Sequence, residues 1–118
     1  MHTHHAIDYV EITVRDLAAA KAFYTAAFGW ELTDYGPAYA GIVGAGKEAG
    51  GLTVGEPKGG GPLVILYSDD LEASQASVER AGGSITTPIF SFPGGRRFHF
   101  ADPSGNELAV WSPAADHA

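Results

Sequence analysis

The sequence predicts an α+β fold built from two copies of one unit, in which a strand and a helix precede three further strands. Two observations support this prediction: 16 glycines and 7 prolines divide the 118 residues into short segments, and one helical pattern occurs twice at a constant spacing. With 45% hydrophobic and 18% charged residues, the composition is typical of a globular protein. We expect one domain, residues 1–118, whose two copies occupy residues 6–57 and 62–113.

The first copy opens with a strand at residues 6–15, where apolar and polar side chains alternate. This alternation places Tyr9 and Glu11 on one face and Val10, Ile12 and Val14 on the other. Asp16 is expected to cap a helix and Gly29 to end it. Three more strands are expected at residues 30–35, 38–44 and 51–56, with a hairpin turn at 44–51 and a flexible connector at 58–62.

The second copy repeats this pattern at an offset of 54 residues. An apolar strand is expected at residues 63–68, followed by a helix from Asp70 to Gly83. Along the two helices, Leu17, Ala20, Tyr24 and Ala27 correspond to Leu71, Ser74, Val78 and Ala81. Strands are expected at 84–88, 96–101 and 107–112, with a turn at 102–105. An offset that holds over six positions indicates an internal duplication.

Composition excludes several classes of function. There is no cysteine, so disulfides and thiolate chemistry are excluded. The net charge of −7 disfavours nucleic acid as a partner, because a phosphate backbone would be repelled. No apolar run approaches the roughly 20 residues that span a bilayer, so no membrane partner is expected. The amino terminus does not resemble a signal peptide, and we expect a cytoplasmic location.

Three motifs resemble one known family. They are VRDLAAAKAFYTAAFGWEL, SDDLEASQASVERAGGSI and FHFADPSGNELAVW, and they occur in this order at the family's spacing. The chain resembles the vicinal oxygen chelate superfamily, which includes glyoxalase I, fosfomycin-modifying enzymes, bleomycin-binding proteins and extradiol dioxygenases. The resemblance implies two βαβββ units that form curled mixed sheets around an open cleft, with the helices outside, and commonly a homodimer. Members of this family differ in function, so the fold alone does not assign one.

The resemblance also implies where metal ligands would lie. The family's positions fall on Tyr9, Leu63 and Ala109, with the remaining one near Thr53. Leu63 and Ala109 have no donor atom, and the hydroxyls of Tyr9 and Thr53 are poor ligands for a divalent ion. We therefore expect no metal and no other cofactor at these positions. A relocated site made by Glu11, His99 and Glu107 remains an alternative, although solvated polar side chains are the simpler interpretation.

The same strand faces predict the lining of a small-molecule cleft. Its expected ligand-binding residues are Tyr9, Thr53, Leu63, Tyr67, Arg97, Glu107, Ala109 and Trp111. Tyr67 and Trp111 are suited to stack on a ligand, but core packing explains such aromatic residues equally well. Arg96 and Arg97 are suited to hold an anion, but solvated loop charges are the commoner case. Glu11 and His99 are the candidate catalytic acid–base residues.

Two classes of function remain open. The protein either binds a small organic molecule without a metal, or acts as a glyoxalase-like lyase or isomerase, or a dioxygenase, through relocated ligands or metal-free acid–base chemistry. A homodimer is expected, because an open curled sheet leaves edges that a second subunit can cover. The histidines His2, His4 and His5 are expected to belong to a frayed terminus outside the site.

Overall fold

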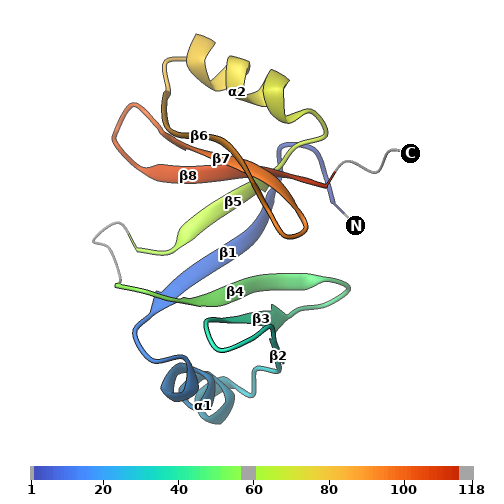
Figure 1. Cartoon of the computed structure of the whole chain (residues 1–118), viewed down its shortest axis with the longest axis vertical. Coiled ribbons are helices and arrows are strands. Elements are labelled where there is room, and N and C mark those ends of the chain that lie inside the picture. The colour runs from blue at the N-terminus through green and yellow to red at the C-terminus, as the bar shows by residue number, and fades with distance from the viewer. Residues whose placement is uncertain (1, 57–60, 115–118) are drawn as a thin grey trace. The chain divides into compact units, whose positions relative to one another are not determined.

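The computed structural model describes residues 2–56 and 61–114. The chain divides into two compact units: unit 1 comprises Tyr9–Leu63, and unit 2 comprises His2–Asp8 together with the chain from Val64 onward. Each unit has one helix and a four-stranded mixed sheet in βαβββ order (Figure 1). The predicted α+β fold is therefore confirmed. Among the described residues, no helix is long and apolar enough to cross a membrane.

Unit 1 follows the predicted order of elements. They are β1 (Ile7–Val14), α1 (Leu17–Phe28), β2 (Leu32–Asp34), β3 (Tyr39–Val43) and β4 (Glu48–Val54). The strands lie in the order β2-β3-β4-β1, with β1 parallel to β4 and the other pairs antiparallel. Asp16 caps α1 by accepting a hydrogen bond from the backbone N–H of Ala19, and Gly29 ends it at φ 72°. The turn predicted at 44–51 is wrong in its second half, because β4 already begins at Glu48.

The core of unit 1 lies between α1 and its sheet. Leu17 from the helix packs with Ala40, Ile42 and Leu52 from β3 and β4. Ile12 and Val14 of β1 pack against the same cluster, which confirms the predicted alternation along this strand. Helix α1 therefore covers one face of the sheet, and Tyr9 and Glu11 lie on the other face.

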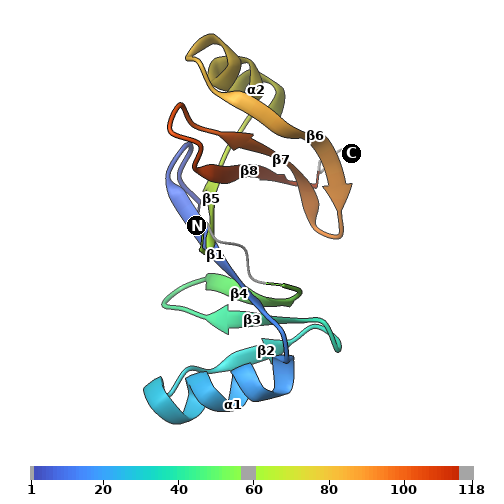
Figure 2. The same ribbon diagram turned by 90° about the vertical axis from the view of Figure 1, so that its left-hand side faces the viewer.

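Unit 2 repeats the arrangement. Its elements are β5 (Leu63–Tyr67), α2 (Leu71–Arg80), β6 (Ser84–Phe92), β7 (Gly95–Ala101) and β8 (Glu107–Pro113), and its strand order is β5-β8-β7-β6. Leu71 of α2 packs with Phe98 and Val110 of the sheet, so α2 covers one sheet face (Figure 2). Most of the connector predicted at 58–62 falls at residues 57–60, which lie outside the described residues.

Helix α2 ends earlier than the duplication predicts. Asp70 caps its start as expected, but the left-handed residue after the helix is Gly82, at φ 103°, and not Gly83. The N–H of Gly83 donates to the carbonyl of Val78, as in a Schellman motif. Two adjacent glycines allow the helix to end one residue sooner, because glycine adopts positive φ without a steric cost.

Candidate functional site

The predicted site residues lie on the sheet faces that carry no helix, which we call the far face of each unit. Tyr9, Glu11 and Thr53 belong to unit 1 and Leu63 ends it, whereas the remaining six lie in unit 2. These six are Tyr67, Arg97, His99, Glu107, Ala109 and Trp111. Each unit brings some of its own residues together, and the expectation that both sets line one cleft stays a prediction.

A chain of hydrogen bonds connects three tyrosines and two glutamates on the far face of unit 1. The phenol oxygens of Tyr9 and Tyr39 are 2.8 Å apart. The hydroxyl of Tyr9 lies 3.0 Å from Glu48, and that of Tyr39 lies 3.0 Å from Glu11. Each phenol has one proton to donate, so the two phenols share two protons among these three contacts. The hydroxyl of Tyr35 binds the second carboxylate oxygen of Glu48 at 2.6 Å. Tyr9, predicted to line the cleft, and Glu11, predicted as an acid–base residue, therefore belong to one polar network.

Two glycines make room for this network. Gly41 and Gly51 are paired across β3 and β4, and Gly51 also pairs with Glu11 on β1. A Cβ atom on Gly51 would collide with the hydroxyl of Tyr39, and one on Gly41 would collide with the carboxylate of Glu48. The absence of side chains at these two positions lets the phenol and the carboxylate lie flat over the sheet.

Burial determines the chemistry of the two central phenols. Desolvation, followed by contacts with neighbouring tyrosine and glutamate side chains, raises the pKa of Tyr39 far above its ordinary value of 10.0. Burial also raises the pKa of Tyr9, and the nearby Glu48 raises it further. Both side chains thus stay protonated at neutral pH. They are hydrogen-bond donors, and a protonated phenol is a poor ligand for a metal ion.

This network predicts how stability changes at alkaline pH. The pKa values of Tyr9 and Tyr39 in the folded protein exceed the unfolded value of 10.0. Their contribution to the free energy of unfolding is therefore complete below pH 10.0, and it declines above pH 10.0 because the phenols of the unfolded chain ionise there. We expect the free energy of unfolding to fall above pH 10.0, with these two phenols ionising last in an ultraviolet titration. In a Tyr9→Phe, Tyr39→Phe double variant, the free energy of unfolding should fall less above pH 10.0 than it does in the parent protein. An equal fall in both proteins would show that these two phenols do not cause it.

On the far face of unit 2, residues on adjacent strands lie side by side in cross-strand pairs. Tyr67 on β5 pairs with Trp111 on β8, which pairs in turn with Arg97 on β7. Ala109, which is buried, pairs with His99 in the next row. Phe98 points instead into the core under α2, so it lies on the sheet face opposite His99. Tyr67 and Trp111 form an edge-to-face contact with ring centroids 5.8 Å apart.

A buried carboxylate lies beside this aromatic pair. Asp8 accepts hydrogen bonds from the indole N–H of Trp111 at 3.0 Å and from Nδ1 of His2 at 2.8 Å, and its side chain is 5% exposed. The imidazole of His2 stacks on Tyr67 with centroids 4.8 Å apart and an interplanar angle of 12°. The same imidazole meets Trp111 edge-on at 5.3 Å.

The expectation that the first histidines form a frayed terminus is therefore wrong. Besides His2, His4 accepts a hydrogen bond from the backbone N–H of Asp69, and His5 is hydrogen-bonded to Ser74 at 2.9 Å. The backbone N–H of His5 also donates to the carbonyl of Tyr67. These polar contacts fix the segment against unit 2.

The charged residues that the sequence singled out in unit 2 lie on two sides of its sheet. Nδ1 of His99 lies 3.1 Å from Glu107, so these two predicted residues form a pair. The guanidinium of Arg97 lies over the rings of Phe90 and Phe92, 5.6 Å from each centroid. Arg96 points instead towards α2.

Arg96 makes a two-pronged ion pair with Glu72 of α2. This pair lowers the pKa of Glu72 through the hydrogen bond from the guanidinium. Arg96 is therefore engaged on the helix side, and Arg97 alone of the two arginines lies on the far face.

The residues at the family's metal positions do not fit a divalent ion. Leu63 and Ala109 have no donor atom, and the hydroxyl of Tyr9 is a protonated phenol bound to Glu48 and Tyr39. Within residues 2–56 and 61–114, no three histidine, cysteine or acidic side chains gather as a metal site would require.

Sequence reasoning missed Tyr35, Tyr39, Glu48, Asp8 and His2. Glu48 was assigned to a turn, and Tyr39 lies in a predicted strand whose partners were unknown. The signal that identifies Tyr39 is its cross-strand neighbourhood of two glycines, which becomes visible only once the register of β3 and β4 is known. No local pattern links Asp8 to Trp111, because the two residues lie far apart in the sequence.

Comparisons with known proteins agree with this architecture. Putative glyoxylase CFP32 of Mycobacterium bovis is 30% identical over 115 residues, covering 88% of this chain and 44% of its own length. The Mn(II)-bound glyoxalase of Novosphingobium aromaticivorans is 26% identical with a TM-score of 0.69, covering 100% of this chain and 44% of that one. The chain thus spans less than half the length of both relatives.

Methylmalonyl-CoA epimerase of Mycobacterium tuberculosis shares the fold, with a TM-score of 0.75 at 18% identity and coverage of 98% of this chain and 93% of that one. A family model matches residues 6–110, which include every described strand and helix as far as β8. The chain belongs to the Glyoxalase/Bleomycin resistance protein/Dioxygenase superfamily.

Proposed function

We propose that the protein binds a small planar organic molecule on the far face of unit 2, without a divalent metal at the family's usual positions. The ligand stacks against Tyr67 and Trp111 and directs an N–H or O–H donor at Asp8. The observation that supports this function is the position of His2, whose planar ring already makes this set of contacts. In the unbound protein the imidazole of His2 occupies the ligand position, and a ligand displaces it.

The chemistry of the surface supports an uncharged or weakly basic ligand. A buried carboxylate accepts donors, and two aromatic rings provide stacking surface at little entropic cost. The names of the relatives, a glyoxylase and a coenzyme A ester epimerase, place them in the chemistry of small organic molecules. A cytoplasmic location and a homodimer remain predictions beside this proposal.

Benzimidazole tests this proposal, because it has a planar ring and one N–H donor. We expect it to raise the melting temperature and to perturb tryptophan fluorescence, and the N-methyl analogue to bind about three- to tenfold more weakly. His2→Ala should bind benzimidazole about tenfold more tightly, since it removes the internal competitor. EDTA should change nothing. Equal binding of both compounds, weaker binding to His2→Ala, or loss of binding in EDTA would contradict the proposal.

One observation favours a second candidate, metal-free proton transfer. Glu107 orients His99 by accepting a hydrogen bond from Nδ1, and the side chain of His99 is 14% exposed. An oriented imidazole is the commonest acid–base group in enzymes. Glu11, the other predicted catalytic residue, lies in unit 1 and accepts from Tyr39. Chemical change of a bound compound, lost in His99→Gln, would favour catalysis over binding alone.

A further inference from the structure

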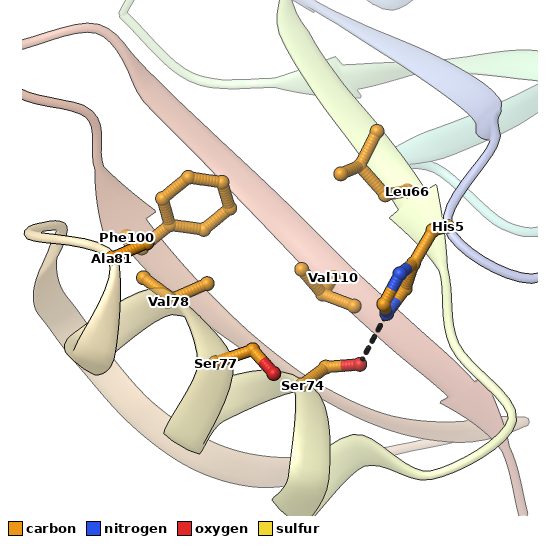
Figure 3. Close-up of a pocket in the computed structure, with 8 residues that line it drawn as sticks. All are labelled: His5, Leu66, Ser74, Ser77, Val78, Ala81, Phe100 and Val110. Carbon is orange, nitrogen blue, oxygen red and sulfur yellow. Dashed lines mark hydrogen bonds between the residues drawn. The ribbon is translucent and has the colours of Figure 1, made fainter.

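A cavity of about 280 Å³, open to solvent, lies between α2 and the sheet of unit 2, on the side opposite the far face. Its walls include Ser77 and Val78 of α2, Leu66, Phe100 and Val110 of the sheet, and His5. Phe100 and Val78 lie at one end and Leu66 and His5 at the other, with Val110 between them (Figure 3). Since Ala81 at the end of α2 is exposed, a small molecule can enter there.

The internal duplication explains why this space is empty. In unit 1, the ring of Tyr24 stacks on Trp30 with centroids 4.6 Å apart, and the two rings pack against the core under α1. At the offset of 54 residues, Val78 takes the place of Tyr24 in unit 2, and Ser84 takes the place of Trp30. The second unit therefore lacks both aromatic rings that fill the equivalent space in the first.

The missing pair also indicates the shape of a suitable occupant. Unit 1 shows that a flat ring fits between a helix and a sheet of this architecture. An enclosed cavity of roughly 150 Å³ binds benzene. The present cavity, at about 280 Å³, has room for one ring with a small substituent, and its open side leaves part of that ring in water. The walls are mainly apolar, and His5 is the one titratable residue among them, which favours an uncharged ligand.

Little of the cavity surface is polar, and the polar side chains among its lining residues are Ser74 and Ser77 of α2 and His5. The hydroxyl of Ser74 is hydrogen-bonded to Ser68 at 2.7 Å and to His5 at 2.9 Å, so it is already engaged. The hydroxyl of Ser77 accepts from Arg80 at 3.2 Å, and within the described part of the chain no acceptor takes its own proton. Ser77 therefore has a proton to donate to an oxygen atom of a ligand.

We propose that this cavity is a second binding site, separate from the far face, for an uncharged single-ring aromatic molecule with one oxygen acceptor. The ring takes the place that Tyr24 and Trp30 fill in unit 1, between Val78 and Phe100. Its oxygen accepts a hydrogen bond from Ser77. This site does not depend on the function proposed above, because the far face of unit 2 lies on the other side of the sheet.

The test uses p-cresol and toluene, which differ only in the hydroxyl group. We expect p-cresol to bind with a Kd of about 1 mM or tighter, with nuclear Overhauser contacts to the methyl groups of Val78, Leu66 and Val110. Toluene should bind about three- to tenfold more weakly, and Ser77→Ala should remove that difference. Contacts confined to Tyr67 and Trp111, or no binding at millimolar concentration, would overturn the proposal.

Two variants block the cavity from different positions. Val78→Phe and Ala81→Leu should each weaken p-cresol binding by at least about tenfold while leaving benzimidazole binding unchanged. Glu79→Gln, on the exposed side of the same helix, is the matched control and should bind p-cresol as the parent does. If either folded blocking variant bound p-cresol like the parent, the site would be elsewhere. If neither blocking variant folds, the nuclear Overhauser contacts between p-cresol and the methyl groups of the parent protein decide whether the ligand binds in this cavity.

Discussion

Replacing Phe98 by alanine is expected to lower the free energy of unfolding by about 3–5 kcal/mol. Phe98 is fully buried and packs with Leu71 of α2 and Val110 of β8. Truncation removes the apolar contacts and leaves a cavity that the surrounding strands cannot close. Urea denaturation followed by circular dichroism measures the change, which should appear as a lower midpoint with the slope retained.

A matched control is Phe28→Ala in α1. Phe28 is also a phenylalanine, but its side chain is 66% exposed, so its truncation should change stability by only about 0.5 kcal/mol. Equal losses for the two variants would show that Phe98 does not anchor the core of unit 2. Leu52→Ala provides the counterpart in unit 1, because Leu52 is fully buried under α1; we expect a loss of about 2–5 kcal/mol.

The parts of the fold that the sequence predicts well depend on local signals. Asp16 and Asp70 cap the two helices as expected, since a cap needs only a short polar side chain three residues before a free backbone N–H. The alternation along residues 6–15 also assigns the correct face to Tyr9 and Glu11. The resemblance to the vicinal oxygen chelate superfamily is confirmed by the family match over residues 6–110.

The ends of elements were harder to predict, because strand pairing decides them. The strand predicted at residues 84–88 is too short, because β6 continues past Pro88 to Phe92. Proline is tolerated there because β6 is the edge strand of its sheet, and its pairing with β7 is irregular between Thr87 and Phe90. Similarly, β4 begins at Glu48 because it pairs with Val43 across a bulge.

The candidate site shows the same limit. Strand alternation placed Tyr67, Trp111 and His99 on the face away from α2, because side-chain direction in a strand is a local property. The carboxylate that completes the site, Asp8, comes from a segment 103 residues away from Trp111 in the chain. Such a contact depends on tertiary packing, and a single sequence contains no signal for it.

Replacing Trp111 by alanine is the substitution with the largest expected effect on function. We expect it to abolish benzimidazole binding, because it removes one of two aromatic surfaces and the group that orients Asp8. It should also lower the free energy of unfolding by about 3 kcal/mol, since the indole is half-buried and its N–H bond to a buried carboxylate is lost. Calorimetric titration measures the first effect, and urea denaturation measures the second.

Trp111→Phe separates the two contributions of the indole. It keeps an aromatic ring beside Tyr67 but leaves Asp8 without the indole donor, so binding should weaken without being lost, and stability should fall by about 1–3 kcal/mol. In the proposed site, ligand binding uses both the aromatic ring at position 111 and the oriented carboxylate of Asp8. The benzimidazole affinity of Trp111→Phe should therefore lie between that of the parent and that of Trp111→Ala. If Trp111→Ala bound benzimidazole as tightly as the parent, Trp111 would be a packing residue, and the ligand site would have to be sought elsewhere.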